Sequence, residues 1–176
     1  MEKTTGNQVF HVCIKTVWAC IIAFSVTILL VNFMVGDQIG LKSLNKDLGS
    51  LGEYGSIAAA TLWFLRHTWL YVHKNKRIGS KYLKELYMVL KKYHTFIGYA
   101  VLAVTTTHGI YFFIKGSHPI IRIYSGIFTF VCLLLLAVAG ILLQMFKSQK
   151  KSVSYRKIHQ MIAILFGLGL IIHLMV

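Results

Sequence analysis

Apolar residues run along this chain in five long stretches, which short polar connections separate. A helix that crosses a membrane needs about 20 consecutive, mostly apolar residues. The pattern therefore predicts an all-α integral membrane protein, a bundle of five transmembrane helices that forms a single domain over residues 1–176. The five spans are expected at approximately 16–36, 54–73, 93–114, 120–146 and 157–176.

Two stretches near these spans need separate interpretation. The span 16–36 is too long for a removable signal peptide and has no small-residue cleavage site, so we keep it as a helix. The stretch 81–90 has apolar residues at helical spacing, and we expect it to lie along the membrane surface.

The composition supports a membrane protein and sets its orientation. The chain is 56% hydrophobic, and its net charge of +14 would by itself suggest a nucleic-acid partner. However, Lys and Arg gather in the connections 74–92 and 147–156, as the positive-inside rule expects. We therefore expect the lipid bilayer, and no nucleic acid, as the partner. Placing both connections in the cytoplasm puts the N-terminus inside and the C-terminus outside a bacterial cytoplasmic membrane, with the third and fifth spans parallel.

Candidate chemistry lies in four histidines within the third and fifth spans: His94, His108, His159 and His173. The two histidines of each span are fourteen positions apart. Fourteen residues rise about 21 Å along a helix, and they make four turns at the 3.5-residue period of a helical bundle, so both rings point from one face. On parallel spans His94 then faces His159 near the cytoplasmic side. His108 faces His173 towards the outer side.

These pairs predict two haem b groups, with the four histidines as axial ligands of the haem iron. Two imidazoles fill both axial positions of a haem, which makes it an electron carrier. Arg66, in the second span, is expected to pair with a propionate of the cytoplasmic-side haem, although snorkelling to the interface is a competing interpretation. Small residues near the histidines would leave room for a flat ligand or for helix packing: Gly98, Gly109, Ala163, Gly167 and Gly169. No catalytic residue is predicted.

Other readings of the histidines stay open. A lone histidine in a membrane helix can bond a neighbouring backbone carbonyl, but two identically spaced pairs make this the weaker interpretation. A histidine-lined metal carrier would usually add carboxylates at membrane depth, and all five acidic residues lie outside the spans. His11 and His73 are interpreted as interfacial residues without a role.

Two stretches resemble a known family, the ferric-reductase-like transmembrane domain of ferric reductases, NADPH oxidases and the haem subunit of the bacterial methionine sulfoxide reductase system. They are KKYHTFIGYAVLAVTTTHGIYFF (91–113) and YRKIHQMIAILFGLGLIIHLMV (155–176), with a weaker match at LGEYGSIAAATLWFLRH (51–67). The resemblance covers about residues 50–176. It implies two b-type haems and electron transfer from a cytoplasmic flavoprotein or a quinol to an external acceptor, which would be a metal chelate, a protein or oxygen.

The chain also departs from that family. It has no Gly-rich dinucleotide fingerprint, and it ends three residues after His173, so we expect it to depend on a separate electron donor. Some family members have six spans rather than five. The function expected is a transmembrane electron relay that serves as a subunit of a reductase. One alternative is a stand-alone ferric, metal or oxygen reductase acting at the outer haem, and another is a non-redox, histidine-lined metal carrier.

Overall fold

The computed structural model describes residues 2–35, 40–75, 79–115, 119–146 and 152–176. These residues form five α-helices: α1 (Glu2–Val35), α2 (Lys42–Lys74), α3 (Ser80–Lys115), α4 (Ile120–Met145) and α5 (Ser152–Met175). The prediction of an all-α protein is therefore confirmed.

Four segments of these helices are long and apolar enough to cross a membrane: Val9–Met34, Ser80–Lys115, Ile120–Met145 and Val153–Met175. The segments support an integral membrane protein, and large apolar side chains are exposed along them, for example Leu135 and Val138 on α4. Helix α2 is not among the four, because polar residues interrupt it along its length: Lys42, Lys46 and Asp47 in the first turns, and Glu53, Arg66 and His67 later on. The count of five transmembrane helices stays a prediction.

Four helices begin earlier than the predicted spans, which start near residues 16, 54, 93 and 157: α1 at Glu2, α2 at Lys42, α3 at Ser80 and α5 at Ser152. Helix α2 starts at Lys42, so the polar residues 42–53 continue the second predicted span as helix. The stretch 81–90 is the first part of α3 rather than a separate surface helix, because no proline or glycine interrupts the chain between Ser80 and Gly98. With 36 residues α3 is about 54 Å long, which exceeds the roughly 30 Å of a hydrocarbon core. The stretch is helical, as its spacing predicted, and its location along the membrane surface stays a prediction.

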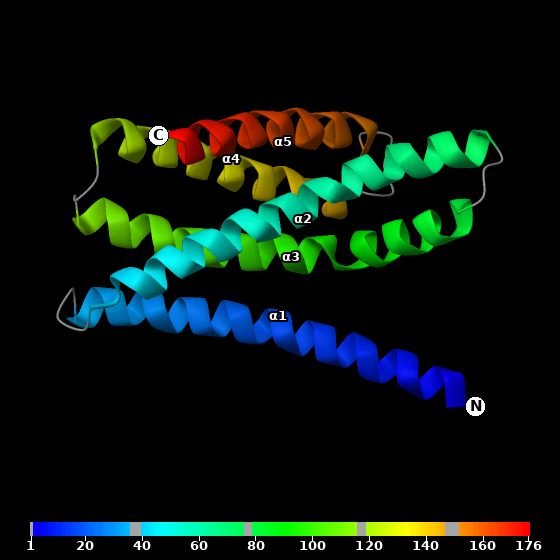
Figure 1. The fold of residues 1–176 in the computed structure, drawn as a ribbon, viewed down its shortest axis with the longest axis horizontal. Helices are drawn as coiled ribbons and strands as arrows, with labels where there is room; N and C mark the ends of the chain where they lie inside the picture. The colour runs from blue at the N-terminus through cyan, green and yellow to red at the C-terminus, as the bar shows by residue number, and fades with distance from the viewer. Residues whose placement is uncertain (1, 36–39, 76–78, 116–118, 147–151) are drawn as a thin grey trace.

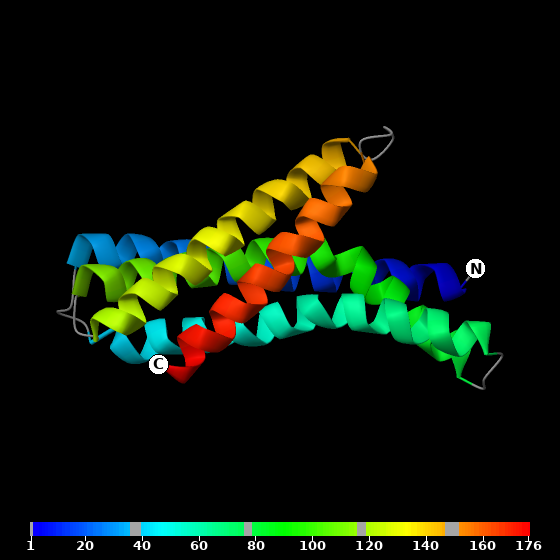
Figure 2. The same ribbon diagram turned by 90° about the horizontal axis from the view of Figure 1, so that it is seen from above.

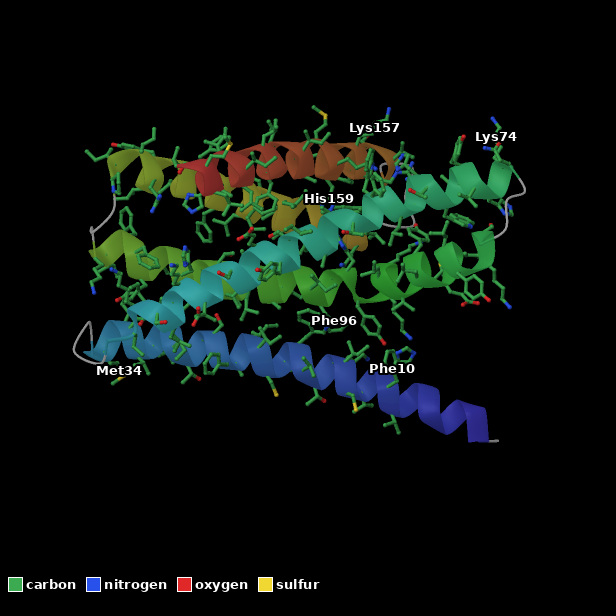
Figure 3. The ribbon with its side chains drawn as sticks, in the orientation of Figure 1. Phe10, Met34, Lys74, Phe96, Lys157 and His159 are labelled. Atoms are coloured by element: carbon green, nitrogen blue, oxygen red, sulfur yellow. The ribbon has the colours of Figure 1, made fainter. Side chains whose placement is uncertain are left out.

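The helices alternate in direction, so α1, α3 and α5 run one way while α2 and α4 run the other (Figure 1). The parallel arrangement expected for the third and fifth spans is present. Helices α1, α2 and α3 lie side by side, and the α4–α5 hairpin crosses them obliquely (Figure 2). Lys74 and Lys157 lie at one end of the molecule and Met34 lies at the other (Figure 3), so both basic connections meet the bundle at the same end.

Helices α2 and α3 pack closely because three glycines of α2 lie against α3. A Cβ atom added at Gly49, Gly52 or Gly55 would lie 2.5 Å from a side-chain atom of α3. The atoms it would meet belong to His108, Thr105 and Val101, respectively. Small residues allow membrane helices to approach at the level of the backbone.

Buried polar pairs and an apolar core join the remaining helices. Ser25 of α1 and Thr107 of α3 have hydroxyl oxygens 2.9 Å apart, and both side chains are buried. Asn32 of α1 and Asn45 of α2 are joined by two amide hydrogen bonds of 2.9 and 3.2 Å. The apolar core joins α3 to α4 through Tyr93, Ile97, Val101 and Leu133. Phe96 of α3 packs against this core on the side that faces α1 (Figure 3).

Candidate functional site

His94 of α3 and His159 of α5 lie next to each other, as the sequence predicted. Their ring centroids are 6.3 Å apart and the ring planes are inclined by 77°. Among the described residues the Nδ1 atom of each ring is buried and has no hydrogen-bond partner. The His159 ring also lies beside the backbone of Leu136 on α4, whose carbonyl can accept a hydrogen bond from it. His159 lies on the side of α5 that faces the other helices (Figure 3). Because a buried polar group without a partner is costly, this pair is a candidate ligand site.

The separation of the two rings suits a single metal ion between them. With metal–nitrogen bonds of about 2.0 Å on opposite sides of a metal, two imidazoles have centroids about 6 Å apart. Gly98, one turn after His94, faces open space, since a Cβ added there would meet no atom within 4 Å. Gly109 and Gly167 are open in the same way. His94 and His159 are thus spaced to hold one metal ion, and they would hold a haem iron if a haem were bound.

Gly169 and Arg66 have surroundings that do not involve the histidine pair. An added Cβ at Gly169 would lie 3.1 Å from Phe128 and Thr129, so this glycine serves helix packing. Arg66 is partly buried on α2. Within the described part of the chain no hydrogen bond or ion pair engages its guanidinium. The role predicted for Arg66 is thus still a prediction.

His108 is held by α2. Its Nδ1 atom lies 2.8 Å from the backbone carbonyl oxygen of Asn45. A carbonyl only accepts hydrogen bonds, so Nδ1 carries the proton and Nε2 is the nitrogen with a lone pair. A backbone carbonyl is a usual partner for the second nitrogen of a metal-ligating histidine, because it fixes the ring and raises its basicity.

His173 is held by α4 in a similar way. Its Nδ1 atom lies 3.0 Å from the hydroxyl oxygen of Ser125, and that hydroxyl donates to the carbonyl of Arg122 at 3.0 Å. The Ser125 hydroxyl therefore bonds the Nδ1 atom of His173, as acceptor or donor according to the tautomer of the ring. A Cβ added at Gly126 would lie 3.1 Å from the Cε1 atom of His173, so this glycine makes room for the ring.

His108 and His173 are not brought together as the other two histidines are. Among the described residues no ring contact joins them, and each bonds a different neighbouring helix. The outer pair therefore stays a prediction, although each ring has Nδ1 engaged by a neighbouring helix.

His11, which the sequence gave no reason to single out, connects α1 to α3 beside the histidine pair. Its Nδ1 atom donates to the Tyr93 hydroxyl, and Lys92 lies 2.6 Å from its Nε2 atom. Tyr93 precedes His94 directly and is buried in the core. His11 therefore helps to position the start of the site rather than being only an interfacial residue. The sequence could not predict this role, because it depends on how α1 packs against α3.

The fold and this geometry define a helical integral membrane protein with a histidine pair between α3 and α5. Comparison of the chain with protein-family models, with curated proteins and with solved structures finds no match. Function is therefore argued from the site alone.

Proposed function

We propose that the protein is a di-haem b-type membrane cytochrome that moves electrons across the membrane as the relay subunit of a reductase. The observation that carries the proposal is the His94–His159 pair, with ring centroids 6.3 Å apart and the two rings supplied by different helices. Two histidines at this separation, from different membrane helices, suit the axial positions of one iron. A bound haem b supplies a reversible one-electron carrier.

His108 and His173 would hold the second haem. Each stands fourteen positions after the first histidine of its helix, and each has its Nδ1 atom engaged in a hydrogen bond. Nε2 is then the nitrogen suited to bind iron. Closing this pair around a haem requires α3 and α5 to approach each other at the outer level.

Electrons are proposed to pass from a cytoplasmic flavoprotein or a quinol to an external metal chelate, protein or oxygen. The basic connections at the Lys74 and Lys157 end support a cytoplasmic location for that end. The His94–His159 pair is then the inner site and His108 and His173 form the outer site. Arg66 on α2, whose guanidinium bonds no described residue, is proposed to pair with a propionate of the inner haem.

The decisive experiment measures haem in protein purified from haem-supplemented cells. We expect two haem b per chain, a Soret band, and a reduced-minus-oxidised spectrum typical of bis-histidine iron. A colourless protein would overturn the proposal.

An experiment in liposomes that are chemically reduced from one side then distinguishes the relay from the stand-alone reductase. Direct reoxidation by an external ferric chelate or by oxygen indicates the reductase, and a need for an added protein acceptor indicates the relay.

A bare transition-metal ion between His94 and His159 is the second candidate, since the 6.3 Å separation would suit it equally well. Two neutral nitrogens without a carboxylate make a weak site for a divalent ion. No acidic residue of the sequence lies in the predicted spans. Metal bound in the absence of a Soret band would favour this carrier.

A further inference from the structure

Helices α2 and α3 keep one register along their antiparallel contact. Gly52 of α2 lies against Thr105 of α3, where an added Cβ would be 2.5 Å from the Thr105 side chain. Nearer the end of the pair, Trp69 of α2 stacks on Tyr87 of α3, with ring centroids 5.9 Å apart and ring planes inclined by 10°. The two contacts are seventeen positions apart on α2 and eighteen on α3, so the side-by-side packing continues without a change of register.

This register brings two cations to the same level. Arg66 is fourteen positions after Gly52 on α2, and Lys91 is fourteen positions before Thr105 on α3. Because the two helices run in opposite directions (Figure 1), equal steps from one contact end at one level. The guanidinium and the ammonium group therefore belong to the same layer of the α2–α3 pair, one turn deeper in the bundle than the aromatic stack.

The aromatic stack connects both cations to a third hydrogen-bond donor. The Nζ atom of Lys91 lies over the Tyr87 ring, 5.7 Å from its centroid, and that ring stacks on Trp69. Arg66 precedes Trp69 by three positions, so the two side chains share a face of α2. The Nε1 atom of Trp69 is buried, and no described residue accepts a hydrogen bond from it.

No acidic side chain of the described residues balances this group. Neither a hydrogen bond nor an ion pair engages Arg66 or Lys91 within the described part of the chain. Glu85 is the only acidic residue of α3, and it is two positions from Tyr87, which places it on another side of the helix. Like charges at one level of two packed helices repel each other, and a buried N–H group without an acceptor is costly. A bound oxyanion would remove both costs.

We propose that Arg66, Lys91 and Trp69 form an oxyanion-binding site between α2 and α3. A guanidinium binds a carboxylate or a phosphate through two parallel N–H donors, and an ammonium group adds a point charge. The indole supplies one further donor. The predicted third span begins at residue 93, so Lys91 lies at the membrane boundary, where Trp and Tyr side chains are also enriched.

Two sources carry this oxyanion chemistry at that level. One is the phosphate of an anionic lipid, since lysines and arginines at the cytoplasmic surface attract such lipids. The other is a propionate of the inner haem, because His94 follows Lys91 by three positions, about 4.5 Å along the helix. The second source rests on the proposed function, whereas the site itself does not.

The experiment measures lipid binding and haem retention on the same purified protein. Native mass spectrometry follows the binding of phosphatidylglycerol, which is anionic, and of phosphatidylcholine, which is zwitterionic, and dialysis follows haem loss. Arg66→Gln and Lys91→Gln should each weaken one of the two ligands about tenfold, as expected for the loss of a charge-assisted hydrogen bond. Trp69→Phe, which keeps the aromatic stack and removes the N–H donor, should weaken the same ligand by a smaller factor.

Matched variants control for charge and for ring chemistry. Lys81→Gln removes the same charge from an exposed position of α3, and Trp63→Phe removes an exposed indole from α2. Both should behave like the wild type. Lys91→Arg, which keeps the positive charge, should also retain binding, and unfolding titrations in detergent check that each variant is folded.

The pattern of losses identifies the source. Weaker phosphatidylglycerol binding with unchanged haem retention indicates a lipid phosphate, and the reverse indicates a haem propionate. Lipid binding and haem retention that are both unaffected by Lys91→Gln and Trp69→Phe, or that respond equally to the control variants, would overturn the site. A wild-type protein without haem would overturn the proposed function, and lipid binding alone would then decide on the site.

Discussion

Gly49 of α2 lies directly against the ring of His108, so that a Cβ atom at position 49 would be 2.5 Å from both Nδ1 and Cε1. The ring also donates to the Asn45 carbonyl, one turn earlier on α2. A single segment of α2 therefore holds His108 by shape and by hydrogen bonding.

Gly49→Ala should displace the His108 ring and alter the outer haem. The added methyl group cannot be accommodated without movement, and overpacking of this kind costs typically about 1–3 kcal/mol. We expect a changed or lost outer-haem spectrum with the inner haem retained. Gly55→Ala is the control, because its Cβ would be as close to Val101 as that of Gly49→Ala is to His108. A similar loss of stability with both haem spectra unchanged is expected there, and equal spectral effects of the two variants would contradict the prediction.

Variants that each lack one of the four histidines should fall into two pairs, and the members of a pair should lose the same haem. His94→Ala and His159→Ala are expected to remove the same haem, and His108→Ala and His173→Ala the other, because each haem loses one of its two axial ligands. Haem-to-protein ratios and redox titration of the four variants measure this. His67→Ala serves as the control, since His67 is exposed and bonds only the Trp63 carbonyl of its own helix among the described residues. Losses that pair His94 with His173 would refute the parallel arrangement of ligands.

Arg66→Gln tests the propionate partner. Because the Arg66 guanidinium bonds no described residue, its removal should change the free energy of unfolding by no more than about 0.5 kcal/mol. The inner haem should nevertheless bind more weakly and titrate at a lower potential, since a positive charge near a haem favours the reduced state. Haem retention during dialysis and a redox titration report both effects. With His67→Gln as the neighbouring control, an inner haem unaffected by Arg66→Gln would favour snorkelling to the interface.

Thr107→Val should loosen the contact between α1 and α3. Thr107 bonds both the hydroxyl and the backbone carbonyl of Ser25, and hydrogen bonds between membrane helices contribute about 0.5–2 kcal/mol. The loss should appear as a lower midpoint in a detergent unfolding titration. Thr61→Val is the matched control, because the Thr61 hydroxyl is exposed and bonds only the Ile57 carbonyl within its own helix. An equal midpoint for the two variants would show that the interhelical bond contributes nothing measurable.

Much of the fold could be predicted from hydropathy, and the ends of the helices could not. Long apolar runs predict membrane-spanning helices whatever the arrangement of those helices. Consecutive spans alternate in direction, so the pattern also predicted that α3 and α5 are parallel. The early starts at Lys42 and Ser80 were missed because polar residues continue a helix as readily as apolar ones do when no proline or glycine interrupts them. Helix α2 shows the difference most clearly, since its polar first turns are held by Asn45 and Gly49 against neighbouring helices.

The candidate site was predicted in part for a related reason. Each helix has its two histidines fourteen residues apart, and the two helices are parallel, so His94 and His159 were predicted at one level. The structure brings these two rings together. The roles of Ser125 and Gly126 depend on how α4 crosses α5, which no property of either helix alone determines. Gly126 and Gly140 of α4 are fourteen positions apart in the sequence, like the two histidines of α5. Only the structure shows that Gly126 lies against His173 and Gly140 against His159.

The oblique crossing of the α4–α5 hairpin gives any ligand between His94 and His159 a mechanical role. The hairpin packs mainly within itself and meets the three other helices chiefly where α3 touches α4. A ligand held from both sides joins two halves of the molecule that otherwise share a narrow contact. A ligand that binds only when the two halves are together stabilises the joined form by mass action. Binding of the cofactor would therefore also complete assembly of the protein.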